Sequence, residues 1–169
     1  MNETITIRFA ETQDLPSIVA IYNQAIKSKT ATADIHEFEL ADRITWFEKY
    51  SKDSYPIYVA ELNKEVVAYA TLSPYRPGRA ALSKVAEISY YVDFSFHGKG
   101  IGTELLEHVI ADCKRINKKF LLAILMDVNV SSVGILNKFN FQEWGVLPGI
   151  VELEDSSCGH LIYGLDLGS

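Results

Sequence analysis

Cysteine is scarce in this sequence, and apolar residues never form a long run. The two cysteines among 169 residues, Cys113 and Cys158, lie far apart and lack the spacing of metal ligands. No stretch approaches the ~18–20 consecutive apolar residues of a membrane-spanning helix, and residues 1–8 lack the apolar core of a signal peptide. We therefore expect a cytoplasmic protein without membrane contact, in which both thiols are reduced.

Paired histidines and an excess of basic residues are also missing. The four histidines include no pair spaced four residues apart, as two ligands on one helix face would be, so we expect no metal. Lysine and arginine number 16 against 22 aspartates and glutamates, which gives a net charge of −6. Because an acidic chain repels a phosphate backbone, we expect no nucleic-acid partner.

The composition that remains is that of an ordinary globular protein. Hydrophobic residues make up 48% of the chain and charged residues 22%. No stretch rich in proline, glycine or serine divides the chain, and no repeat or block of like charge interrupts it. A chain of this length buries about 70% of its unfolded surface in one compact unit. We therefore expect a single domain over residues 1–169.

Hydrophobic periodicity predicts a succession of strands and helices. Residues 120–126 form a continuous apolar run typical of a strand buried on both faces, and Asp14 before Leu15 and Pro16 is typical of a capped helix start. The expected order is β-α-α-β-β-β-α-β-α-β-β, with the strands flanking the third helix parallel, the others antiparallel, and helices on both faces. Strands are expected at residues 4–9, 56–62, 66–72, 85–93, 120–126, 141–151 and 160–167, and helices at about 15–26, 39–50, 98–116 and 130–139.

A glycine-rich turn leads into the third expected helix. Gly98, Gly100 and Gly102 lack side chains, so the backbone can approach a ligand closely and adopt positive φ angles. Free N–H groups and the positive end of a helix dipole meet at such a turn and favour a diphosphate, with Lys99 adding charge from the rim. Two alternatives are a turn needed only for packing and a dinucleotide-binding turn, whose Gly-x-Gly-x-x-Gly spacing differs from the Gly-x-Gly-x-Gly of this chain.

Three segments follow one another in a recognisable order: Glu87-Ile88-Ser89-Tyr90-Tyr91-Val92, His97-Gly98-Lys99-Gly100-Ile101-Gly102 and Asn129-Val130-Ser131-Ser132-Val133. In this order they resemble the GNAT acetyltransferases. Further segments, at residues 31–34, 46–47 and 74–79, are most similar to the phosphinothricin/methionine sulfoximine N-acetyltransferase branch, and the resemblance covers nearly the whole chain. It implies an α+β GNAT fold, with a mixed, mostly antiparallel and splayed sheet of about seven strands flanked by about four helices.

The resemblance implies acetyl-CoA as the cosubstrate. The glycine-rich turn, with His97 in place of the usual Arg or Gln, would hold the pyrophosphate mainly through backbone N–H groups. The strand before the turn would pair with the pantetheine arm as an added strand does. Asn129 and Ser132 would lie beside this arm, although plain helix caps would look the same in sequence. The expected cofactor-binding residues are Tyr91, Val92, His97, Gly98, Lys99, Gly100, Ile101, Gly102, Asn129 and Ser132.

The resemblance also assigns two catalytic groups. Glu87 matches a Glu position of the family and is expected to accept the proton of the attacking amine, directly or through a water, with partial burial raising its pKa. The backbone N–H near Val92 is expected to polarise the thioester carbonyl as an oxyanion hole does. Where the family often has a Tyr or His to protonate the leaving thiolate, this chain has Leu136.

The acceptor implied by the resemblance is a primary amine of a small molecule. An amino acid or an analogue such as phosphinothricin or methionine sulfoximine would fit. The expected substrate-binding residues are Glu87 together with Tyr75, Arg76 and Arg79 of a proline-rich loop. The two arginines would hold an acceptor carboxylate by bidentate contacts.

Two other functions stay open from the sequence. One is a GNAT-like module that binds coenzyme A as a sensor, which Leu136 favours. The other is a protein N-acetyltransferase, which needs a long open groove that the loop at 73–81 would oppose by capping a small pocket. The resemblance further implies a homodimer with the last strands at its interface.

Overall fold

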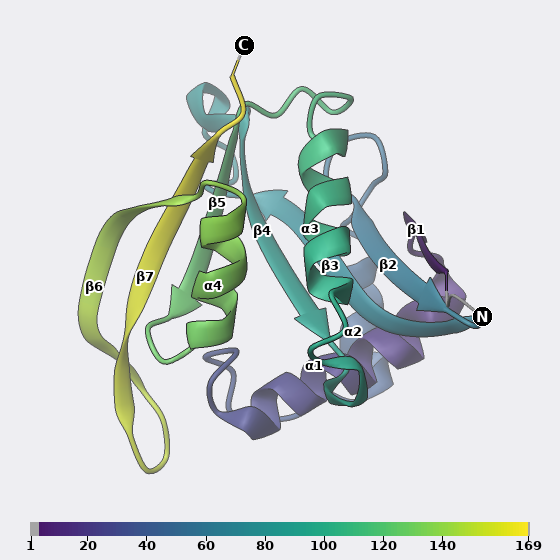
Figure 1. Ribbon diagram of the computed structural model, residues 1–169, viewed down its shortest axis with the longest axis horizontal. Coiled ribbons are helices and arrows are strands. Elements are labelled where there is room, and N and C mark those ends of the chain that lie inside the picture. The colour runs from purple at the N-terminus through teal and green to yellow at the C-terminus, as the bar shows by residue number, and fades with distance from the viewer. Residues whose placement is uncertain (1–3, 169) are drawn as a thin grey trace.

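One seven-stranded sheet runs through the molecule (Figure 1). The computed structural model describes residues 4–168. The strand order is β1-β2-β3-β4-β5-β7-β6, and neighbours are antiparallel except for the parallel pair β4 and β5, which confirms the predicted mixed sheet. The strands are β1 (Ile5–Phe9), β2 (Ile57–Leu62), β3 (Glu65–Pro74), β4 (Val85–Val92), β5 (Phe120–Met126), β6 (Gln142–Glu152) and β7 (Ser157–Asp166).

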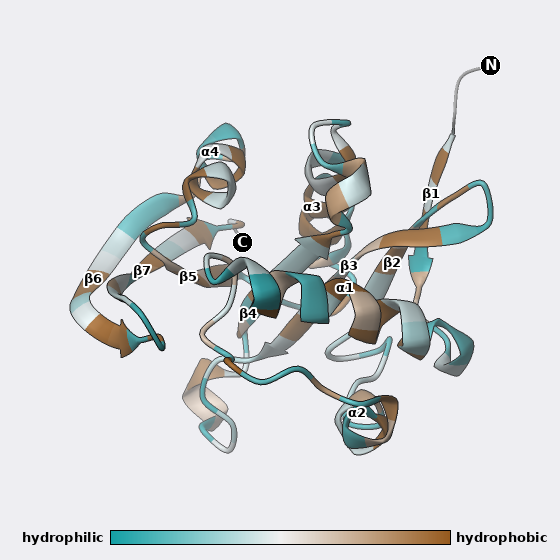
Figure 2. Ribbon diagram, turned by 90° about the horizontal axis from the view of Figure 1, so that it is seen from below, coloured by the Kyte–Doolittle hydropathy of each residue, from teal (hydrophilic) through white to brown (hydrophobic). Residues whose placement is uncertain are grey.

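Four helices cover the two faces of the sheet, as predicted (Figure 2). The first and second lie on one face, and the third and fourth on the other. Strand alternation builds both interfaces: Tyr58 and Ala60 of β2 pack into the core beneath the third helix, whereas Ile57 and Val59 pack against the first. No helix within residues 4–168 is long and apolar enough to cross a membrane. The helices are α1 (Leu15–Ser28), α2 (Leu40–Phe47), α3 (Ile101–Asp112) and α4 (Val130–Lys138).

Two helices end earlier than their periodicity predicts. α3 ends at Asp112, four residues early, because the chain continues in single turns that close on Asn117, whose φ of 55° is left-handed. The Arg115 side chain folds back within this segment, with Nε 2.7 Å from Oδ1 of Asp112. α2 ends at Phe47, three residues early, and gives way to turns closed by bonds between residues three apart. In both segments apolar residues continue at helical spacing beyond the last helical residue, although the helical hydrogen bonds stop there.

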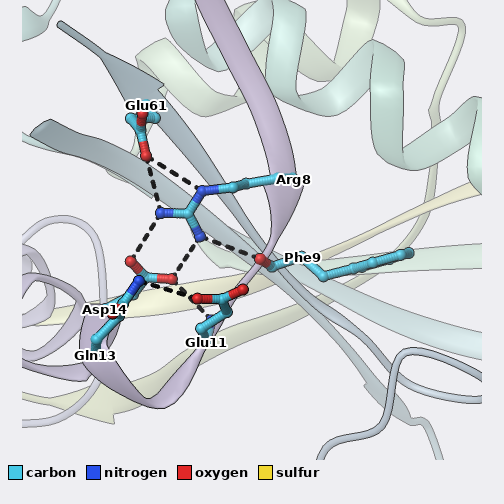
Figure 3. A network of polar contacts seen from close by, with 6 residues as sticks. All are labelled: Arg8, Phe9, Glu11, Gln13, Asp14 and Glu61. Atoms are coloured by element: carbon cyan, nitrogen blue, oxygen red, sulfur yellow. Dashed lines mark hydrogen bonds and ion pairs between the residues drawn. The ribbon is translucent and has the colours of Figure 1, made fainter. Parts of the chain in front are cut away.

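Asp14 does not cap α1 with its side chain, contrary to the prediction. Its carboxylate instead accepts hydrogen bonds from Arg8, at 2.7 and 2.9 Å, and from the Glu11 backbone N–H at 2.7 Å (Figure 3). Arg8 also contacts the Glu61 carboxylate on β2 at 2.9 Å. Burial raises the pKa of Asp14, but the bonds from Arg8 and Glu11 outweigh this and lower it. The network therefore ties β1 to β2 and to the start of α1.

Candidate active site

Strands β4 and β5 separate after three paired residues. Val85–Glu87 pairs with Phe120–Leu122, and within residues 4–168 no ladder joins the two strands beyond that point. β4 nevertheless runs on to Val92, and β5 continues to Met126 against β7. The edges of β4 and β5 therefore face an opening between the carboxyl ends of the two strands (Figure 1). The sheet is splayed at this point, as the resemblance implies.

The backbone of Val92 faces this opening. The N–H of Asp93 donates to the Val67 carbonyl at 2.8 Å, so Asp93 is directed at β3. Because backbone groups alternate in direction along a strand, the N–H and C=O groups of Val92 and Tyr90 point away from β3. The Val92 carbonyl accepts a hydrogen bond from His97 Nε2 at 2.9 Å. His97 thus fixes the end of β4 while the Val92 N–H remains directed at the opening.

The glycine-rich turn follows β4 and starts α3. Gly98 and Gly100 have φ angles of 74° and 81°, which glycine adopts without steric cost. Gly100 is the N-cap of α3, and its carbonyl accepts the first helical bond from Glu104 N–H at 3.0 Å. The N–H groups of Ile101 and Gly102 precede that bond and have no partner within the helix. These donors and the positive end of the helix dipole are suited to bind an anion.

Gly102 lies close to two apolar side chains. A Cβ atom at this position would lie 3.4 Å from Val92 Cγ2 and 3.5 Å from Ile135 Cδ1, which are ordinary van der Waals distances. The start of α3 therefore approaches both the end of β4 and the inner side of α4.

A cavity of about 500 Å³ opens between the end of β4, the glycine-rich turn and α4. This volume lies within the usual range for small-molecule and cofactor sites. Among the predicted cofactor residues, all within residues 4–168, Lys99 does not line the cavity. Its ammonium lies 4.8 Å from the centroid of the Phe96 ring. The predicted residues that line the cavity are Tyr91, Val92, His97, Gly98, Gly100, Ile101, Gly102, Asn129 and Ser132.

Asn129 and Ser132 act in capping and also line the cavity. Oδ1 of Asn129, the N-cap of α4, accepts a hydrogen bond from Ser132 N–H at 3.3 Å, while its amide NH₂ is a separate donor. The Ser132 hydroxyl is hydrogen-bonded to the hydroxyl of Tyr90, which also lines the cavity and links β4 to α4. Leu136, one helical turn further, is fully buried and has no proton to give.

Glu87 lies on the face of β4 opposite to that of Tyr90. Side chains alternate along a strand, so Glu87 and Tyr91 share the face toward α1 and α2, whereas Tyr90 and Val92 pack toward α3. Glu87 is half-buried and stands outside the walls of the 500 Å³ cavity. Burial raises the pKa of its carboxyl above the ordinary 4.5. Such a carboxylate is better suited to accept a proton near neutral pH than an exposed one.

Arg43 on α2 is a cation that the sequence interpretation missed. Its guanidinium carbon lies 3.7 Å from the ring centroid of Trp46 and 5.3 Å from that of Tyr22. Within residues 4–168 it makes no ion pair. The Tyr22 ring lies 5.1 Å from that of Tyr91, centroid to centroid. The stacked cation therefore belongs to the side of the sheet that carries Glu87.

The three predicted acceptor residues Tyr75, Arg76 and Arg79 lie in the loop after β3. Ser73 pairs with Glu87 in the sheet register, so this loop begins two residues beyond a partner of Glu87. Both arginines are exposed, and none of the three residues lines the cavity. The structure therefore separates the acceptor candidates from the cofactor candidates.

Comparison with known proteins identifies the family. Residues 18–141 match the acetyltransferase (GNAT) family. The chain belongs to this family. The L-methionine sulfoximine/L-methionine sulfone acetyltransferase of Pseudomonas aeruginosa is 34% identical over 146 residues, which cover 86% of this chain and 84% of that protein.

Solved GNAT structures agree in fold. An N-acetyltransferase from Staphylococcus aureus is 36% identical, with a TM-score of 0.92 over 98% of this chain and 99% of that one. A phosphinothricin acetyltransferase from Sinorhizobium meliloti, solved in complex with acetyl-CoA, is 26% identical, with a TM-score of 0.91 over 98% and 89% of the two chains. The GNAT fold is confirmed, and this GNAT protein is an N-acetyltransferase that uses acetyl-CoA as its cosubstrate.

Tyr90 and Arg43 are absent from the site residues expected from the sequence, for different reasons, although the aromatic cluster that includes Tyr90 is expected in the core and the pocket wall. Strand alternation alone places Tyr90 on the same face as Val92, so that signal was available. The hydrogen bond between Tyr90 and Ser132 gave no signal in the sequence, because this bond depends on where α4 packs. Arg43 carries no local mark, since a cation stacked on rings from two helices has the same sequence pattern as a solvated one.

Proposed function

We propose that this acetyltransferase moves the acetyl group to the primary amine of a small molecule, an amino acid or an analogue such as phosphinothricin, methionine sulfoximine or methionine sulfone. The observation that carries the proposal is the arrangement around β4. A half-buried Glu87 with a raised pKa lies on one face, and the cavity with its anion-binding turn lies at the end of the strand. The relatives' names supply the acceptor class.

Acetyl-CoA suits the cavity in shape and charge. The N–H groups of Ile101 and Gly102 are placed to hold the pyrophosphate at the start of α3. The open edge of β4 at Val92 can hydrogen-bond the pantetheine amides as a neighbouring strand would. Asn129 can donate its amide N–H groups to the same arm from the other side of the opening.

Two residues of β4 have different roles in the reaction. Glu87 accepts the proton of the acceptor's ammonium group, directly or through a water, so that the amine can attack the thioester carbon. The Val92 N–H donates to the thioester oxygen as negative charge develops on it. Transfer is direct, because no covalent acyl-enzyme is needed when amine and thioester meet beside one strand.

Three arginines are candidates for binding an acceptor carboxylate. Arg76 and Arg79 belong to the loop that begins beside Glu87, and Arg43 lies on the same side of the sheet without an ion-pair partner within residues 4–168. A guanidinium can bind a carboxylate through two parallel hydrogen bonds. An acceptor held in this way would present its α-amine toward Glu87.

The working form is a cytoplasmic homodimer of single-domain chains. Apolar side chains on β6 support this, since Trp144 and Val146 are each 49% exposed and Ile150 is 56% exposed. Apolar groups clustered on one strand are typical of a surface that a partner covers. An identical chain is the simplest such partner, because a two-fold axis matches a patch to itself.

A thiol-release assay with a panel of amines tests the proposal. Purified protein is mixed with acetyl-CoA and with methionine sulfone, methionine sulfoximine, phosphinothricin, common amino acids or a peptide, and the acetylated product is identified by mass spectrometry. Amine-dependent release with the amino acids or their analogues is the expected result. Release with the peptide alone would replace the proposal by a protein N-acetyltransferase. Tight coenzyme A binding without release with any amine would replace it by the sensor function that Leu136 favours.

A further inference from the structure

The leaving sulfur of this reaction needs a proton. When the amine nitrogen bonds to the thioester carbon, the C–S bond breaks and its electron pair stays on sulfur. A thiolate formed in an apolar groove is poorly solvated, and this raises its affinity for a proton. Tyr90, Tyr91, His97 and Lys138 are the cavity-lining side chains within residues 4–168 that could serve as acids.

Three of these four groups are unsuited, because each packs away from the opening, has its ring proton engaged, or lies far along α4. The ring of Tyr91 packs on the other face of the sheet, with its centroid 5.3 Å from that of Tyr69. His97 is held by the Val92 carbonyl at the anion-binding end. Lys138 is exposed in the last turn of α4, about 9 Å along the helix axis from the first turn.

Tyr90 occupies the remaining position. It lies in the splayed part of β4, between Glu87 and Val92, and its side chain is on the face opposite to that of Glu87. Its hydroxyl is hydrogen-bonded to the Ser132 hydroxyl in the first turn of α4. The positive end of that helix favours negative charge nearby. The hydroxyl therefore lies beside the opening and has a second hydroxyl behind it.

We propose that Tyr90 is the general acid that protonates the leaving thiolate of coenzyme A, with Ser132 relaying a replacement proton. The inference rests on the proposed acetyl transfer. Glu87 takes the ammonium proton and passes it to bulk water, and the nitrogen loses its second proton to water as the tetrahedral intermediate collapses. The Tyr90 O–H gives one proton to sulfur, and the tyrosinate regains a proton from water through the Ser132 hydroxyl. The amide and the free thiol are the products, and no further reactant is needed.

Burial is consistent with this role. It raises the pKa of Tyr90 to about 12, and the Ser132 hydrogen bond offsets this only in part. The phenol is therefore protonated throughout the pH range in which the amine reacts. The same apolar surroundings raise the pKa of the thiol that forms, which favours transfer of the proton to sulfur.

Tyr90→Phe is the test, because it keeps the ring and removes the proton. The first readout is the pKa of the thiol of enzyme-bound coenzyme A, followed by the ultraviolet absorbance of its thiolate. Wild type should show a lower thiol pKa than Tyr90→Phe, since the phenol stabilises the thiolate by hydrogen bonding. The second readout is kcat for acetyl transfer, which should fall by about 10²-fold or more with little change in the KM for acetyl-CoA.

Tyr163→Phe is the matched control, because Tyr163 is a buried strand tyrosine outside the cavity. It should change neither readout. An equal thiol pKa in wild type and Tyr90→Phe, or an equal kcat, would overturn the proposal. The thiol titration uses coenzyme A alone, so it decides the role of Tyr90 even if every amine fails as acceptor and the proposed function falls.

Discussion

Gly100 controls the geometry of the anion-binding turn. Its φ of 81° lies in the left-handed region, and nothing stands within 4 Å of where a Cβ would be, so any cost of a side chain is conformational. An L-residue pays about 1–2 kcal/mol there. In Gly100→Ala the free turn can relax, and coenzyme A binding must restore the left-handed conformation, so binding should weaken about 10-fold by calorimetry. Gly134→Ala, in the middle of α4 with equally open space, should leave binding unchanged, and equal weakening by both would refute the account of the turn.

The raised pKa of Glu87 predicts that kcat/KM falls on the acid side of its pH profile. Burial raises this pKa above 4.5, and the carboxyl accepts a proton only when ionised. With one acceptor amine, kcat/KM should fall as the pH drops through a midpoint above that of an exposed glutamate. Glu87→Gln should not show this fall in its residual activity. A fall that persists unchanged in the variant would assign the titration to another group.

At the scale of elements, the Arg8–Asp14–Glu61 network holds β1 in place. The pKa of Asp14 is lowered in the folded state, so its ionised form contributes stability above the unfolded-state value of about 3.8, and this is lost as the pH falls through the folded pKa. Asp14→Asn should cost about 1–2 kcal/mol at neutral pH, measured by urea unfolding. The difference from wild type should shrink below pH 4. A pH-independent difference would contradict the assigned role.

Sequence predicts elements well where the pattern is local. The β5 run was placed at residues 120–126, as observed, because a strand buried on both faces is apolar throughout. The turn at Gly98 and Gly100 was also found, since positive φ angles call for glycine. The sequence did not predict where α3 ends or which residue Asp14 contacts, because both depend on contacts that apolar spacing does not encode.

The same limit applies to the site. The residues expected to bind the cofactor follow from segments in a recognisable order, and all of them but Lys99 line the cavity. The position of Arg43 depends on how α2 packs on the sheet, so the sequence gives no sign that this cation lies on the side of Glu87. Motifs carry the part of the function that a family shares, whereas specificity rests on tertiary packing.

At the scale of the whole molecule, the exposed apolar strand β6 predicts self-association. Ile150→Glu would place a charge in a dimer interface and should yield monomers in sedimentation velocity. Ile44→Glu is the matched control, because Ile44 is 47% exposed on α2, away from β6, and it should leave the dimer intact. A wild-type protein that sediments as a monomer at all concentrations would contradict the proposed dimer.

Proton transfer from the amine to Glu87 is tested by the acetyl-transfer rate of Glu87→Gln beside wild type. Glutamine keeps the size of the side chain but cannot accept the proton at this position. The account predicts a fall in kcat of about 10²-fold or more with coenzyme A binding intact, while Glu65→Gln, at the exposed start of β3, behaves as wild type. A Glu87→Gln enzyme with wild-type kcat would show that the amine loses its proton elsewhere.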